Sequence, residues 1–184
     1  MGDTDPTWFW AVARASGIAA YAALSLDVLS GLLMSTGLGD RWMPRARSLD
    51  IHRFLSVAAL SLTAVHAFAL LGDRYIDFGL LEVLVPFSSE YRPFAVGLGV
   101  IAAWLAWVVH TSFALRRWLG SRAWRWMHYA SFLLFVLATA HGLLAGTDAR
   151  TTGMLLLHAV PATLVLWWAL YRVTQAIARA RRPA

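Results

Sequence analysis

Six histidines are the residues of this chain best suited to chemistry, because each falls within a long hydrophobic stretch. They are His52, His66, His110, His128, His141 and His158. Ionisable side chains are costly inside a bilayer and usually serve a function there, and neutral imidazole is a common metal ligand. The histidines therefore indicate a buried metal or cofactor site, with hydrogen bonds between helices as the structural alternative.

Four of these histidines form two pairs whose spacing suits two stacked cofactors. His52 and His66 lie 14 positions apart, which in a helix is about 21 Å along the axis with directions that differ by about 40°. His128 and His141 lie 13 positions apart, a rise of about 20 Å. On two parallel helices they form matched pairs at matched depths, and each pair can ligate a b-type haem from both sides.

The 13-residue spacing raises a geometric problem. It leaves His128 and His141 about 140° apart around an ideal helix. Two solutions remain open: a local bulge or kink in that helix, or two imidazoles that reach their sites in different ways. His110 and His158 fall in the same two layers, where a hydrogen bond to a haem propionate, a proton path or plain packing suits them better than ligation.

The elements that must position these residues are membrane helices. Hydrophobic residues make up 59% of the 184 residues, above the roughly 45–50% of soluble domains. They gather in five stretches long enough to cross a bilayer, which needs roughly 20 residues. These stretches cover about 8–35, 51–71, 94–115, 126–145 and 153–172, with Pro161 as an expected kink. The fold class predicted is an all-α membrane protein, one domain of five transmembrane helices over residues 1–184.

Charge predicts the orientation of this bundle. All 16 basic residues are arginine, and the chain has no cysteine, which excludes iron–sulfur ligation and disulfides. The connections on one side carry Arg41, Arg45, Arg47, Arg116, Arg117, Arg122, Arg125, Arg172, Arg179, Arg181 and Arg182. The other side carries Asp3, Asp5, Asp73, Asp77, Glu82, Glu90 and Asp148, with Arg74, Arg92 and Arg150. By the positive-inside rule the N-terminus faces out and the C-terminus is cytoplasmic, so the basic charge meets membrane lipid and no nucleic acid.

Two charged residues within the first stretch are further candidates. Arg14 lies near the expected depth of His66 and His141, where it is predicted to hold the propionates of the outer haem; an interfacial arginine reaching the headgroups is the alternative. Asp27 lies deeper, and a proton-handling group, a partner for an arginine and a protonated acid all remain open.

The apolar segment 78–87 is too short to span the membrane. It is predicted either to lie in the interface over the outer mouth of the bundle or to form a loop packed on the helices.

These motifs resemble a known family. A His-x13-His helix followed by a His-x12-His helix, here His52/His66 and His128/His141, is similar to the ferric reductase-like transmembrane domain. That domain is shared by ferric reductases, NADPH oxidases and bacterial haem-binding membrane subunits, including the haem subunit of the periplasmic methionine sulfoxide reductase system. The stretches 14–17, 84–93, 115–129 and 141–148 support the resemblance, which covers roughly residues 8–172.

The resemblance implies two b haems, with His52 opposite His128 and His66 opposite His141, in a bacterial plasma (inner) membrane. It implies electron transfer from a cytoplasmic or membrane donor to an extracytoplasmic acceptor, in a ferric reductase-like oxidoreductase component.

Larger members carry an additional first helix and a flavin and nicotinamide domain, neither of which is evident here. The donor would then be a separate flavoprotein reductase or a quinol, with a flavin or quinone at the interface with that partner. The acceptor would be ferric iron, dioxygen or a periplasmic reductase. The alternatives are the haem subunit of a two-component periplasmic reductase and, in another class, a haem-free small transporter or proton channel.

Overall fold

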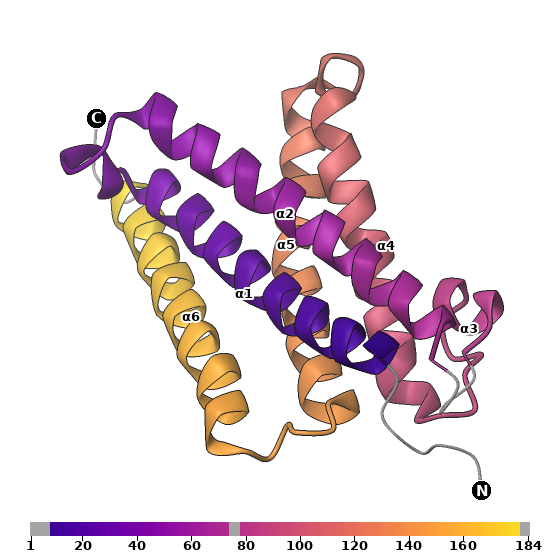
Figure 1. Cartoon of the computed structure of the whole chain (residues 1–184). Helices are drawn as coiled ribbons and strands as arrows, with labels where there is room; N and C mark the ends of the chain where they lie inside the picture. Colours follow the sequence, from indigo (N-terminus) through magenta and orange to yellow (C-terminus); the bar gives the residue numbers. More distant parts are fainter. Residues whose placement is uncertain (1–7, 74–77, 181–184) are drawn as a thin grey trace, which may run out of the picture.

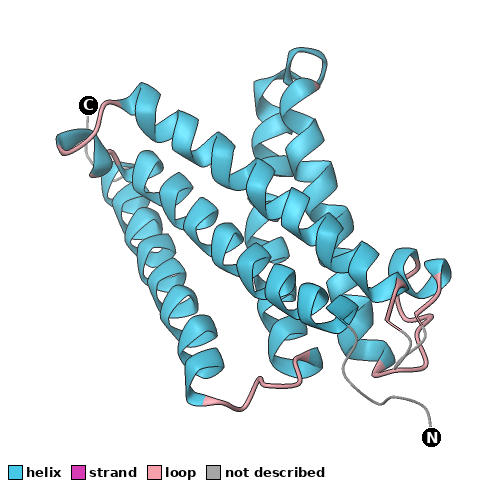
Figure 2. Cartoon of the chain, viewed as in Figure 1, coloured by secondary structure: helices cyan, strands magenta, loops and turns pink. Residues whose placement is uncertain are grey.

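Five long helices make up most of the chain. The computed structural model describes residues 8–73 and 78–180. The long helices are α1 (Trp8–Thr36), α2 (Arg45–Leu71), α4 (Pro93–Ala114), α5 (Arg116–Ala145) and α6 (Thr152–Ala180), with the short η1 (Gly39–Arg41) and α3 (Leu80–Leu84) between them (Figure 1). The described residues contain no strand (Figure 2). All five long helices are long and apolar enough to cross a membrane. The prediction of an all-helical fold with five helices able to span a membrane is thereby confirmed for the described residues.

Several helices extend beyond the predicted hydrophobic stretches. α2 begins at Arg45, directly after the extended residue Pro44, and α6 continues through Pro161 to Ala180. α5 begins at Arg116, although Gly120 interrupts its helical geometry with a φ of 76°, a conformation that glycine adopts without steric cost. Hydropathy marks only the part of a helix that lies in lipid, whereas arginine is a good helix former in water. The arginine-rich turns therefore lengthen the helices outside the apolar stretches.

The helices pack in two groups. α1 packs along α2 and also against α6, while α4 packs along α5. Contact between these groups is sparser, and a small core joins them (Figure 1). Its buried members are Tyr21, Val28, Leu32, Phe135 and Val165. The two helices that carry the paired histidines, α2 and α5, therefore belong to different groups and face each other across the bundle.

Charged residues separate to the two ends of the bundle. The α1–α2 connection, the α4–α5 junction and the C-terminal end of α6 lie at one end (top in Figure 1). That end carries Arg41, Arg45, Arg47, Arg53, Arg116, Arg117, Arg122, Arg125 and Arg172 with Asp40 and Asp50. The opposite end carries Asp73, Glu82, Glu90 and Asp148 with Arg14, Arg92 and Arg150. Asp3, Asp5, Arg74, Asp77, Arg181 and Arg182, which belong to the predicted charge pattern, lie outside the described residues.

The crossing of α2 and α5 resolves the geometric problem of the 13-residue spacing. α5 keeps helical geometry from His128 to His141, so no bulge or break separates these residues. α2 instead runs obliquely across α5, with its first half on one side of α5 and its second half on the other (Figure 1). The direction from α5 towards α2 therefore differs between the two ends, and both His128 and His141 face a histidine of α2. Imidazoles on nearly opposite faces of α5 can both face α2, which is the second of the two predicted solutions.

The apolar segment 78–87 lies at the acidic end and contributes α3. Phe78 is buried, whereas Leu80 and Leu81 are mostly exposed. The indole nitrogen of Trp104 donates a hydrogen bond to the carbonyl oxygen of Leu84 at 2.9 Å, which ties the segment to α4. Exposed leucines on a short helix anchored to the bundle match an interfacial segment better than a loop packed on all sides.

Candidate haem-binding site

The structure brings the four paired histidines together as the spacing suggested. His52 on α2 faces His128 on α5, with ring centroids 6.1 Å apart and planes inclined by 79°. His66 on α2 faces His141 on α5, with centroids 6.3 Å apart and planes inclined by 75°. His52 and His128 lie in the halves of α2 and α5 that begin at the arginine-rich end, and His66 and His141 in the halves that finish at the acidic end.

The separation within each pair fits one metal held between two imidazoles. An imidazole nitrogen lies about 2.0–2.1 Å from a metal that it ligates, and the ring centre about 1.1 Å beyond, so two opposed ligands have ring centres about 6.3 Å apart. The observed values of 6.1 and 6.3 Å agree with this distance. Within the described residues no group of three or more His, Cys, Asp or Glu side chains suits a bare metal ion. Two protein ligands suit haem, which supplies the other ligands itself.

Hydrogen bonds orient the His66–His141 pair for ligation. Nδ1 of His66 lies 2.6 Å from the carbonyl oxygen of Ala13 on α1, and Nδ1 of His141 lies 2.8 Å from that of Ala95 on α4. A carbonyl oxygen only accepts, so each Nδ1 carries the proton and donates it. Nε2 of each ring is then left with its lone pair, which is the arrangement that metal-ligating histidines adopt.

Glycines on the neighbouring helices make room for three of these rings. A Cβ added to Gly17 would lie 2.9 Å from Nδ1 of His66, and one added to Gly99 would lie 2.6 Å from Nδ1 of His141. A Cβ at Gly31 would lie 3.3 Å from Cε1 of His52. These residues were not predicted from the sequence, although Gly17 and Gly31 are separated by the same 14 positions as His52 and His66. That shared spacing on adjacent helices was the available signal.

The His52–His128 pair has different neighbours. Around Nδ1 of His52, Oδ1 of Asp27 lies at 2.8 Å, Oγ of Ser30 at 3.1 Å and the carbonyl oxygen of Asp27 at 3.2 Å. Asp27 therefore contacts a histidine rather than an arginine, and a proton-handling or protonated carboxyl group stays a prediction. His128 stacks on Trp124, with ring centroids 5.2 Å apart and planes inclined by 19°.

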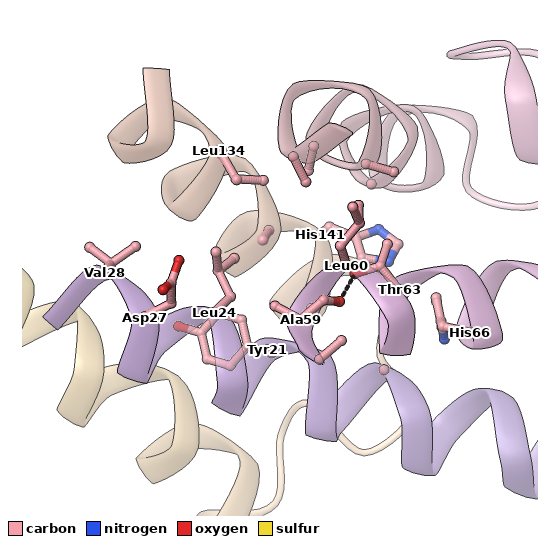
Figure 3. Close-up of a pocket in the computed structure, with 18 of the residues that line it drawn as sticks. Tyr21, Leu24, Asp27, Val28, Ala59, Leu60, Thr63, His66, Leu134 and His141 are labelled. Carbon is pink, nitrogen blue, oxygen red and sulfur yellow. Dashed lines mark hydrogen bonds between the residues drawn. The ribbon is translucent and has the colours of Figure 1, made fainter. Parts of the chain in front are cut away.

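One large cavity connects the two pairs. Its volume is about 1100 Å³, and all six histidines line it, whereas a pocket for one drug-sized ligand has about 300–1,000 Å³. Figure 3 shows His66 on α2 and His141 on α5 at one part of the cavity, and Asp27 on α1 at another, with Leu24 and Leu60 between them. Leucine side chains therefore lie between Asp27, which contacts His52, and the His66–His141 pair.

Arg14, the predicted propionate ligand, lines the cavity near the acidic end. Its guanidinium forms an ion pair with Asp148, and it also lies over the Trp10 ring at 5.2 Å. Asp148 lies next to Thr147 in the connection between α5 and α6, and both line the same cavity. The structure places Arg14 in the lining of the cavity beside Asp148, and its role towards a propionate remains a prediction.

His110 and His158 also line the cavity but stand apart from the two pairs. Nδ1 of His158 donates to the carbonyl oxygen of Met154 one turn earlier at 2.7 Å, and its ring stacks on Tyr21 with centroids 4.5 Å apart. Nδ1 of His110 lies 3.2 Å from Oγ of Ser56 on α2. These contacts match the packing role predicted for both residues, and a hydrogen bond to a propionate or a proton path stays a prediction.

Comparison with known proteins identifies no relative: no family model, no curated protein and no solved structure matches the chain. The resemblance to the ferric reductase-like transmembrane domain therefore rests on the paired histidines and the stretches around them.

Proposed function

We propose that this protein carries electrons across a membrane through two b haems, each ligated by two histidines. One haem, called the inner haem below, is held between His52 and His128, and the outer haem between His66 and His141. Haem supplies the one-electron chemistry when bound. The observation that carries the proposal is the pair of imidazole separations, 6.1 and 6.3 Å, both of which suit a shared metal.

The protein's own residues contribute ligation, orientation and exclusion of water. Ala13 and Ala95 accept the Nδ1 protons of His66 and His141 and so fix their Nε2 lone pairs towards the cavity. Gly17 and Gly99 let α1 and α4 approach close enough to make those hydrogen bonds. Apolar side chains between the layers, such as Leu24 and Leu60, keep the site at low dielectric. A low dielectric is one of the means by which a protein sets the reduction potential of a haem.

The distribution of charge supports a direction for this transfer. Arginines gather at the end nearest His52 and His128 in the part of the chain that the structure describes, and arginine-rich connections stay cytoplasmic. We therefore place the inner haem near the cytoplasmic face of a bacterial plasma membrane. Electrons enter there from a separate flavoprotein reductase or a quinol and leave on the other side, to ferric iron, dioxygen or a periplasmic reductase.

Vesicles that contain the purified protein test this function. With ferricyanide trapped inside and dithionite added outside, we expect the wild type to bleach the trapped ferricyanide much faster than protein-free vesicles do. Removal of one ligand from either layer, in His52→Ala or His66→Ala, is expected to return the rate to that of protein-free vesicles. The matched control is His158→Ala, a buried histidine of the same cavity, which should keep the wild-type rate. Wild-type vesicles no faster than protein-free ones would contradict the function and favour a haem-free transporter or channel.

A further inference from the structure

The two proposed haem sites differ in the groups that lie against Nδ1 of their histidines. In the outer site, His66 and His141 both donate to neutral backbone carbonyls, those of Ala13 and Ala95. In the inner site, the nearest oxygen to Nδ1 of His52 is the carboxylate Oδ1 of Asp27 at 2.8 Å. The carboxyl group and the ring are both largely enclosed, with side-chain exposures of 15% and 18%.

The type of group beside Nδ1 changes how strongly an imidazole donates to iron. A carboxylate beside Nδ1 attracts the proton on that nitrogen more strongly than a neutral carbonyl does and draws it away from the ring. The ring then becomes a more basic ligand at Nε2. A more basic axial ligand favours ferric over ferrous iron, and hydrogen bonding beyond the ligand is one of the means by which a protein sets a haem potential.

We infer that Asp27 is a positioning residue that acts through His52 to lower the reduction potential of the inner haem relative to the outer haem. The inference rests on the proposed function, and it adds a reason for the direction of transfer. An inner haem of lower potential passes its electron outward downhill, so one carboxyl group on α1 favours flow away from the arginine-rich end.

The other charged residues near the inner site contact groups other than His52. Arg53, Arg125 and Arg172 line the cavity at that end, where they would meet the anionic propionates of the haem. Arg53 lies 3.8 Å from Asp50, and Arg172 donates to the hydroxyl of Tyr129 at 3.3 Å. Ser30, at 3.1 Å from the same Nδ1, is neutral and already donates its hydroxyl proton to the carbonyl oxygen of Asp27. Asp27 is therefore the acidic residue that lies against the ligand itself.

A redox titration followed by haem absorption tests this inference. In the wild type we expect two midpoint potentials. In Asp27→Asn the lower midpoint potential, that of the inner haem, should rise. We expect the ferrous-to-ferric ratio of the inner haem at a fixed solution potential to increase about tenfold, which corresponds to a rise of about 59 mV for a one-electron couple. The higher potential should stay unchanged. Ser30→Ala is the matched control, because it removes a neutral group from the same nitrogen, and both its potentials should stay at the wild-type values.

Asp27→Ser gives a second neutral replacement with a different shape, in which the same potential should rise. Unchanged potentials in both Asp27 variants, or an equal shift in Ser30→Ala, would overturn the inference. Loss of the inner haem from both Asp27 variants would overturn it too, since Asp27 would then only hold His52 in place. These outcomes differ from failure of the proposed function, in which the wild type itself would show no b-type haem to titrate.

Discussion

His66→Ala is expected to halve the haem content of the protein, from two haems per chain to one. The alanine removes one of the two ligands of the outer haem and leaves His141 without the imidazole that faces it at 6.3 Å. His141→Ala should have the same effect on the same haem, and His52→Ala or His128→Ala should remove the inner haem instead. The pyridine haemochrome assay, with protein quantified by amino-acid analysis, measures the ratio directly.

His110→Ala and His158→Ala supply the controls for this series. Both residues line the same cavity, but their rings contact Ser56 and Tyr21 rather than a second histidine. Both variants should keep two haems per chain. Loss of a haem in His110→Ala with none lost in His128→Ala would show that the pairing is wrong.

Gly99→Ala is expected to remove the outer haem almost as completely, although it alters no ligand. The added Cβ would lie 2.6 Å from Nδ1 and 2.7 Å from Cε1 of His141, far closer than carbon and nitrogen atoms can pack. The ring must move, and it then loses its hydrogen bond to the carbonyl oxygen of Ala95. Overpacking of this kind costs about 1–3 kcal/mol, and a displaced imidazole no longer faces His66 across the haem. The haem-to-protein ratio should fall towards one.

Gly153→Ala is the matched control, since a Cβ at that helical glycine meets no atom within 4 Å. It should retain both haems. The loss of haem in Gly17→Ala and Gly31→Ala should lie between the losses in Gly99→Ala and Gly153→Ala. Their added Cβ atoms would lie 2.9 Å and 3.3 Å from the nearest atoms of His66 and His52. Full haem content in Gly99→Ala, or equal loss in Gly153→Ala, would mean that the close approach of α4 to His141 does not hold the outer site together.

Much of this arrangement follows from the sequence, because a membrane simplifies the problem. A long apolar stretch in lipid must form a helix, so five stretches predict five helices. The depth of a residue within such a helix follows from its position in the stretch. Sequence position alone therefore assigns His52 and His66 on one helix, and His128 and His141 on another, to two layers.

Features that depend on how helices cross could not be predicted in this way. The angle between α2 and α5 decides which face of α5 each imidazole must use, and neither hydropathy nor spacing contains that angle. Two other features also depend on helix packing. The contact of Asp27 with His52 and the space that Gly17 leaves for His66 require the packing of α1 against α2. The space that Gly99 leaves for His141 requires the packing of α4 against α5. Helix ends were missed for a different reason, since the turns after Arg45 and beyond Arg172 lie past the apolar stretches that were used to find helices.

The central claim is that two haems lie between α2 and α5, each held by one histidine from each helix. A reduced-minus-oxidised absorption spectrum of the purified protein, combined with its haem-to-protein ratio, tests this claim most directly. We predict the bands of b-type haem with two axial histidines and a ratio of two haems per chain. A spectrum without b-type bands would contradict the account and leave a haem-free membrane protein with buried histidines.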